Sequence, residues 1–136
     1  MGARLALETR VARLVARLSR ATGRGGGTTL PGKLVWKADP GAVDALSARL
    51  SQGALVVSAT NGKTTTCAMA ARMLSPTRRL AWNSSGANLA SGIASTLLAA
   101  EDAELGLFEV DEFALPEIVR RVHPRVIALG NLFRDQ

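Results

Sequence analysis

At 136 residues with 47% hydrophobic residues, the chain has room for one domain with a sizeable core and is too apolar to be a disordered tail. Its formal net charge is +6, but residues 1–24 hold six arginines and one glutamate, so residues 25–136 are nearly neutral. Because these residues also include few aromatic side chains, they do not resemble a nucleic-acid-binding domain. The single cysteine, Cys67, excludes an internal disulfide and a cysteine-cluster metal site, and no apolar run reaches the roughly 18 residues of a membrane span.

The first predicted element is an amphipathic basic helix within residues 1–24, over residues 3–21. An apolar stripe and an arginine stripe recur at helical spacing: Leu7, Val11, Leu14 and Leu18, and Arg10, Arg13, Arg17 and Arg20. The helix either packs on the domain with its arginines in water or contacts an anionic membrane surface, and an Arg-rich transit peptide is a third interpretation. Arginines interrupt the apolar positions that a secretory signal needs, so we expect a cytoplasmic protein, at the inner face of the membrane if this helix binds there.

Residues 25–52 are predicted to form a linker and short helices. Glycines at positions 25–27 make the linker flexible. One helical segment opens at Leu30, and another runs from Asp39 to about Leu50, with Asp39 as its N-cap and Pro40 at its first position.

A phosphate-binding loop is predicted in the stretch ATNGKTTT, residues 59–66. A β-branched apolar run predicts a strand at residues 54–57, and high helix propensity predicts a helix through residues 67–74. The turn between them favours phosphate, because helix N-termini present unpaired N–H groups. Gly62 allows close approach, Lys63 can reach terminal phosphates, and the Thr64 hydroxyl can bind Mg²⁺.

This loop is shorter than the full Walker motif, which has a glycine where this chain has Val57. Gly-Lys-Thr also occurs by chance, and the alternative is an ordinary helix start with an exposed lysine. The strand before it, the helix after it and the three successive threonines favour a nucleoside triphosphate site.

Beyond the loop, strands are predicted at residues 79–83, 105–110 and 125–129, and helices at residues 89–100 and 116–122. This alternation predicts a parallel, doubly wound α/β sheet, which binds ligands at the carboxyl ends of its strands. The polar residues expected along that rim are Asn61, Gly62, Lys63, Thr64, Asn83, Asn88, Glu109, Asp111 and Asn131.

Glu109 is the expected magnesium ligand, because it ends a strand on the rim that carries the phosphate loop. Glu109 and Asp111 flank Val110, so we expect them to share a face of the strand. The alternative is a solvated acidic strand end without a ligand.

Four blocks of the sequence, ATNGKTTT, NSSGANLASGIAS, FEVDE and VIALGNLFRDQ, occur in an order that resembles the central ATPase domain of the Mur ligases. Within that family the chain is most similar to the synthetase subunit of lipid II isoglutaminyl synthase. The Arg-rich start and the LPGK segment also resemble that branch. The family fold is a P-loop parallel sheet with flanking helices, of which residues 53–136 would form the first part.

The resemblance implies ATP-dependent activation of the D-isoglutamate α-carboxyl of lipid II as an acyl phosphate, with ammonia from a GatD-like glutaminase partner. It assigns catalysis to Lys63 and Glu109, and Mg²⁺ binding to Thr64 and Glu109. Zinc belongs to a Cys-rich insert of the family that this chain lacks. With the rim residues added, the expected ATP-binding set is Thr60, Asn61, Gly62, Lys63, Thr64, Thr65, Asn83, Asn88 and Asn131.

Three departures from the family pattern shape the expectation. Ala59 replaces a usual loop glycine, which would lower ATP affinity if that position needs a positive φ. Gln136 stands where a histidine helps other Mur ligases to bind a second metal ion. The family continues beyond the match to Gln136, so we expect a fragment or a truncated gene product that is inactive alone. The competing hypotheses are an amino-acid-adding Mur or folylpolyglutamate-type ligase, and an inactive nucleotide-binding remnant.

Overall fold

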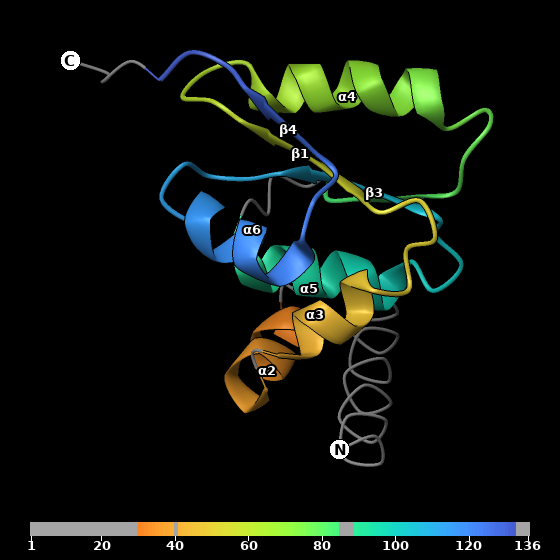
Figure 1. Cartoon of the computed structure of the whole chain (residues 1–136), viewed down its shortest axis with the longest axis vertical. Coiled ribbons are helices and arrows are strands. Elements are labelled where there is room, and N and C mark those ends of the chain that lie inside the picture. The colour runs from red at the N-terminus through yellow and green to blue at the C-terminus, as the bar shows by residue number, and fades with distance from the viewer. Residues whose placement is uncertain (1–29, 40, 85–88, 133–136) are drawn as a thin grey trace.

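The computed structural model describes residues 30–39, 41–84 and 89–132 (Figure 1). The predicted basic helix at residues 3–21, the glycine-rich linker, Pro40, Asn88 and Gln136 lie outside the described residues. Within the described residues no helix is long and apolar enough to cross a membrane. The elements in chain order are α2 Leu30–Ala38, α3 Ala42–Ser47, β1 Ala54–Ser58, α4 Lys63–Leu74, β2 Leu80–Trp82, α5 Ala90–Ala99, β3 Leu105–Glu109, α6 Leu115–Val122 and β4 Val126–Leu129. Strands and helices alternate from β1 onward.

The strands form one parallel sheet with the order β2-β3-β1-β4. This confirms the predicted α/β fold class, and the two central strands are the ones that flank the candidate site. The register pairs Val57 of β1 with Glu109 of β3, and Ser58 with Leu129 of β4. The end of β1 and the end of β3 therefore lie side by side.

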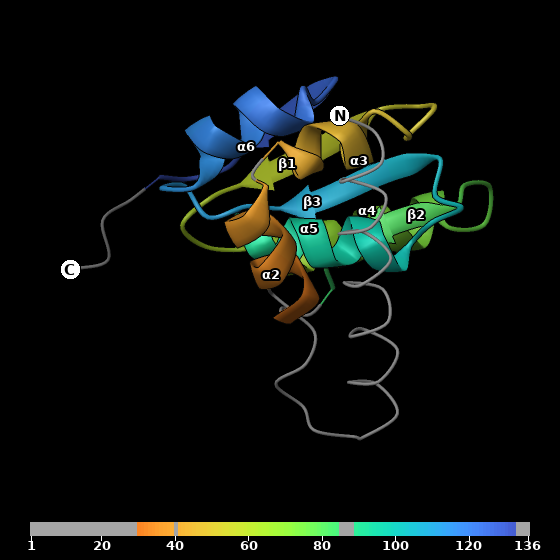
Figure 2. The same cartoon turned by 90° about the horizontal axis from the view of Figure 1, so that it is seen from below.

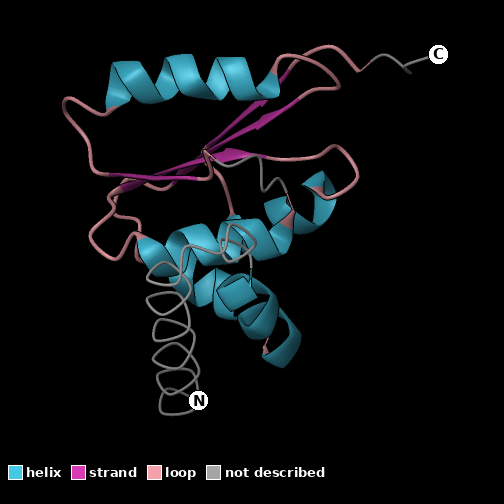
Figure 3. Ribbon diagram, turned by 180° about the vertical axis from the view of Figure 1, so that it is seen from behind, coloured by secondary structure: helices cyan, strands magenta, loops and turns pink. Residues whose placement is uncertain are grey.

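Helices cover both faces of the sheet (Figures 1 and 3). On one face, α4 packs through Cys67 and Ala71 on Val57 and Leu107. On the other face, α5 and α6 cover a larger core around Phe108, with α2 and α3 packed beneath them. Alternate side chains of β1 and β3 reach opposite cores, as the period of a strand requires.

Helix α2 packs closely against α5, as Figure 2 also shows. The N–H of Gly32 donates to Oγ of Ser95 at 2.8 Å. A Cβ at Gly32 would lie 1.8 Å from the carbonyl oxygen of Ser91, so only glycine allows this approach. The glycine of the LPGK segment thus has a packing role.

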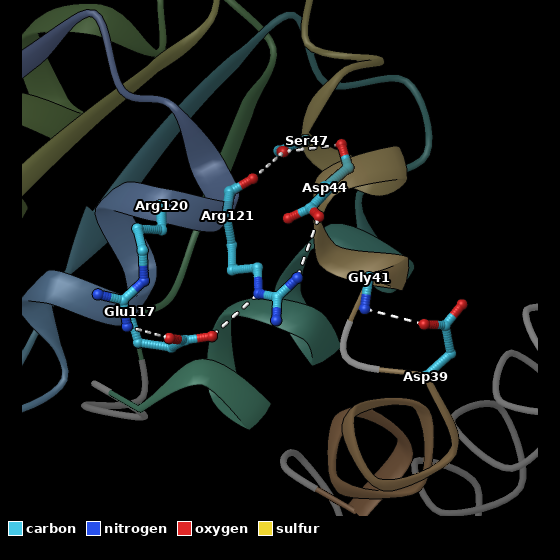
Figure 4. Close-up of polar contacts among 7 residues, drawn as sticks. All are labelled: Asp39, Gly41, Asp44, Ser47, Glu117, Arg120 and Arg121. Carbon is cyan, nitrogen blue, oxygen red and sulfur yellow. Dashed lines mark hydrogen bonds and ion pairs between the residues drawn. The ribbon is translucent and has the colours of Figure 1, made fainter.

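A polar cluster joins α3 to α6 (Figure 4). Arg121 donates to Glu117 at 2.9 Å along α6 and to Asp44 of α3 at 3.3 Å.

The prediction that Asp39 caps a helix over residues 39–50 is wrong, because α3 begins at Ala42 with Gly41 as its N-cap. The Asp39 carboxylate accepts from the N–H of Gly41 at 2.9 Å, so it ties the turn before the helix instead.

Candidate functional site

The loop between β1 and α4 lies where the sequence predicts it, between a strand and a helix. Gly62 is the N-cap of α4 with φ 86° and ψ −4°, a left-handed conformation that glycine adopts without strain. No side chain hydrogen-bonds to this cap, so the first turn presents its N–H groups at the carboxyl edge of the sheet. A helix start of this kind favours a bound anion such as phosphate.

Lys63 lies over its own loop. Its Nζ donates to the carbonyl oxygen of Ala59 and lies 3.4 Å from that of Thr60. It also forms an ion pair at 3.5 Å with Oε2 of Glu112, and the lysine side chain is 12% exposed. The alternative of an ordinary helix start with an exposed lysine is therefore wrong for the side chain of Lys63.

Glu109 faces the start of α4 from the end of β3. The Thr64 hydroxyl donates to Oε1 of Glu109 at 2.9 Å. Glu109 is only 4% exposed, so the alternative of a solvated acidic strand end is wrong. Thr64 and Glu109, the two predicted metal ligands, are thus in direct contact.

Cys67 lies one turn along α4 from Thr64 and is fully buried, so it serves as a small core residue. Burial, and secondly the negative charge of Glu109, raise the pKa of the Cys67 thiol to about 11. The thiol is therefore neutral near pH 7 and is not a nucleophile of this site.

Asn83 follows directly after β2 and holds the backbone of Glu109. Its Nδ2 donates to the Glu109 carbonyl oxygen at 2.8 Å, and its Oδ1 accepts from the Glu109 N–H at 2.8 Å. Asn83 is 2% exposed, so a contact between its side chain and a nucleotide would require these bonds to break. The prediction that Asn83 binds nucleotide thus stays a prediction.

The expectation that Glu109 and Asp111 share a strand face is wrong, because β3 ends at Glu109 and Asp111 begins a turn. The Asp111 carboxylate accepts from the N–H of Phe113 at 3.0 Å. The turn instead brings Glu112 to the loop, where its carboxylate lies 3.5 Å from the hydroxyl of Thr60. Sequence reasoning missed Glu112, and its only signal was its place in the acidic FEVDE block.

Glu112 has a pKa below its ordinary value, because it accepts a backbone hydrogen bond and lies beside the Lys63 ammonium. It is therefore ionised at neutral pH. The Glu112 carboxylate would therefore compete with a bound phosphate for the Lys63 ammonium.

Ala59 does not need the conformation of a glycine. Among the described residues other than glycine, only His123 has a positive φ. Ala59 is buried, and a Cβ on Gly130 would lie 2.7 Å from its methyl group. The methyl group of Ala59, which follows β1, therefore occupies the space that a side chain at position 130, which follows β4, would need.

The remaining predicted residues lie around this centre. The N–H of Thr60 donates to the backbone carbonyl of Asn131 at 2.8 Å, which joins the loop to the end of β4. Asn61, Thr65 and Asn131 are exposed. Their proposed contacts with ATP stay predictions.

The donor set of Thr64 and Glu109 fits magnesium. Mg²⁺ binds oxygen ligands and commonly takes one or two protein groups, with waters and substrate phosphates completing its shell. Within the described part of the chain, no group of three or more His, Cys, Asp or Glu residues could hold a metal ion. One carboxylate and one hydroxyl beside a loop predicted to bind phosphate suit a metal ion that arrives with a nucleotide.

Comparison with known proteins finds similar sequences, although no protein-family model matches the chain. The chain is 33% identical over 129 residues to the MurT subunit of lipid II isoglutaminyl synthase (glutamine-hydrolyzing) from Staphylococcus aureus strain N315. It is 36% identical over 117 residues to the MurT subunit from Streptococcus pneumoniae strain ATCC BAA-255 / R6. These matches cover 93% and 82% of this chain but 29% and 26% of the relatives, so the chain spans less than a third of their length.

Proposed function

Because this chain is a homologue of MurT subunits over most of its length, we propose that it provides the ATP site of a lipid II isoglutaminyl synthase that acts in peptidoglycan synthesis. The observation that carries the proposal is the meeting of three predicted residues at one edge of the sheet. Lys63 lies over the phosphate loop, and Thr64 and Glu109 are 2.9 Å apart beside it.

The proposed reaction is the amidation of a carboxylate in two steps. A carboxylate oxygen of the D-isoglutamate unit attacks the γ-phosphorus of ATP, and ADP leaves to give an acyl phosphate. Ammonia then attacks the acyl carbon, loses a proton, and displaces inorganic phosphate to leave the amide. One oxygen of the original carboxylate therefore departs in the phosphate.

The residues of this chain act on the first step by holding charge. Backbone N–H groups after Gly62 would bind phosphate oxygens, and the Lys63 ammonium would leave Glu112 to meet the terminal phosphates. Thr64 and Glu109 would hold Mg²⁺, which when bound neutralises part of the triphosphate charge. Both side chains already face each other, so little rearrangement is needed.

We further propose that a GatD-like glutaminase subunit supplies the ammonia, since the names of the relatives describe them as subunits of a glutamine-hydrolyzing enzyme. The substrate would be lipid-linked, and the basic helix predicted at residues 3–21 would suit contact with an anionic leaflet. Co-sedimentation with vesicles tests that contact. No preference for anionic over neutral lipid at low salt would contradict it.

Isotope transfer in the full-length synthase complex tests the proposed reaction. Lipid II labelled with ¹⁸O in the D-isoglutamate α-carboxylate should deliver one ¹⁸O atom per turnover into inorganic phosphate. Phosphate without the label would contradict an acyl phosphate, and an amino acid in the product instead of an amide would favour the amino-acid-adding ligase. We expect Glu109→Gln to keep the fold and lose turnover, while Glu104→Gln, just before the other end of β3, retains it.

A further inference from the structure

The side chain of Asn83 continues the sheet one residue beyond the end of β2. The last residue of β2, Trp82, pairs with Leu107 of β3. The Asn83 amide then supplies the donor and the acceptor for Glu109, both at 2.8 Å. An asparagine side chain has the same amide group as a peptide bond, so it can replace a backbone partner at this position.

The backbone at Glu109 is consequently held from both sides. On the β2 side, its N–H and C=O are bonded to Asn83. On the β1 side, the N–H of Val110 donates to the carbonyl oxygen of Val57 at 3.0 Å. A residue fixed in this way has a fixed Cα–Cβ direction, and from it the carboxylate reaches the Thr64 hydroxyl at 2.9 Å.

The two residues of this arrangement are buried, so their hydrogen bonds are costly to lose. Asn83 is 2% exposed and Glu109 is 4% exposed, so water cannot easily replace a lost bond to either group. Loss of the Asn83 amide would leave a buried N–H and C=O of Glu109 without these partners. The end of β3 would then shift to satisfy them and would carry the carboxylate with it.

We propose that Asn83 is a positioning residue that aims Glu109 at the metal of the nucleotide site. The inference rests on the proposed function, because it assumes that Glu109 binds Mg²⁺ together with ATP. Residues that orient a metal ligand typically change metal affinity by about 10- to 100-fold when they are replaced.

The test compares ATP affinity with and without Mg²⁺ by calorimetry on the full chain. The measured quantity is the Mg²⁺ enhancement, the ratio of the dissociation constant without Mg²⁺ to that with Mg²⁺. We expect Asn83→Ala to reduce this ratio by about tenfold or more and to leave Mg²⁺-free affinity nearly unchanged. Asn83→Leu has nearly the same shape and lacks both the donor and the acceptor without adding a charge, so it serves if the alanine variant is unstable.

A double-mutant cycle separates positioning from a merely structural role. If Asn83 acts through Glu109, then Asn83→Ala should remove no further Mg²⁺ enhancement once Glu109→Gln is present. The control is Ser95→Ala, which removes another buried side-chain bond to backbone, the one with Gly32. Ser95→Ala should lower the denaturant midpoint and keep the Mg²⁺ enhancement of the unmodified chain.

Each outcome bears on a different claim. Unchanged Mg²⁺ enhancement in folded Asn83→Ala and Asn83→Leu would overturn the positioning role, as would losses from Asn83→Ala and Glu109→Gln that simply multiply. If the unmodified chain showed no Mg²⁺ enhancement, the proposed metal site would fail, and the inference about Asn83 would fail with it.

Discussion

Replacing Gly32 with alanine tests the packing that joins the LPGK segment to the sheet domain. The added Cβ would lie 1.8 Å from the Ser91 carbonyl oxygen and 2.6 Å from the Ser95 nitrogen. Both are backbone atoms of α5, so no side-chain rotation can relieve the clash. Helix α2 would have to move away from α5, and the Gly32–Ser95 hydrogen bond would break.

The expected loss follows from three contributions. Overpacking costs about 1–3 kcal/mol, and a buried N–H left without a partner costs about 1–3 kcal/mol. The higher helix propensity of alanine offsets roughly 1 kcal/mol. We therefore expect the free energy of unfolding to fall by about 3 kcal/mol, which lowers the melting temperature by about 10 °C in a domain of this size.

Thermal and urea unfolding measure this effect, and Gly41→Ala is the matched control. Gly41 is the N-cap of α3, and its φ of −69° and ψ of −12° suit any residue. The nearest atom to its added Cβ would be Oδ1 of Asp39 at 3.1 Å, which can move. Equal stability of Gly32→Ala and Gly41→Ala would refute the close approach of α2 and α5.

Three further predictions concern the site. Glu112→Gln should bind Mg²⁺–ATP more tightly than the unmodified chain in calorimetry, because the carboxylate no longer competes with phosphate for Lys63; weaker binding would mean that Glu112 assists the nucleotide. Gly62→Ala should lower the free energy of unfolding by about 1–2 kcal/mol through backbone strain alone, since φ is 86° and nothing lies within 4 Å of the added Cβ; an unchanged urea midpoint would contradict this. Cys67 should resist thiol reagents at pH 8 in the folded protein, and rapid labelling would contradict its burial. Its pKa is about 11 in the folded protein, against 9.0 when unperturbed. The free energy of unfolding should therefore fall as the pH rises from about 9 to 11, because the unfolded chain loses the thiol proton first.

The sequence predicts the central part of this fold well because local and tertiary signals agree there. A β-branched run, a Gly-Lys-Thr turn and a helix-forming segment all favour the same strand–loop–helix unit, and the structure has β1 and α4 at those places. The sequence predicts that Glu109 and Thr64 share a site, and they are in contact. Parallel strands bring their carboxyl ends to one edge, which is why the prediction could join residues far apart in the chain.

The rest of the site depends on geometry that periodicity does not encode. Strand alternation placed Asp111 beside Glu109, but β3 ends one residue too early for that rule to apply. The following turn instead brings Glu112, for which the sequence predicts no role, to the loop. Asn83 looked like a rim residue, yet one position past β2 its side chain still reaches the backbone of β3.

Burial was also partly beyond prediction. The segment that forms β4 is apolar and is predicted only as a strand, and in the structure Val126 is 54% and Leu129 is 60% exposed. The exposure arises because, among the described residues, β4 contacts mainly β1 and no helix packs closely on its faces, and such packing is a tertiary property. Asp39 likewise resembles an N-cap in sequence, but its carboxylate is used two residues later, at Gly41.

The most direct test of the central claim is the affinity of the full chain for Mg²⁺–ATP when Lys63 is replaced. Lys63→Ala should weaken binding by about 10-fold or more, because a charge-assisted contact to phosphate contributes about 1.5–3 kcal/mol. Lys33→Ala, which removes an exposed lysine of α2, should leave the affinity unchanged. If Lys63→Ala and Lys33→Ala bound Mg²⁺–ATP as tightly as the unmodified chain, this loop would not be the nucleotide site.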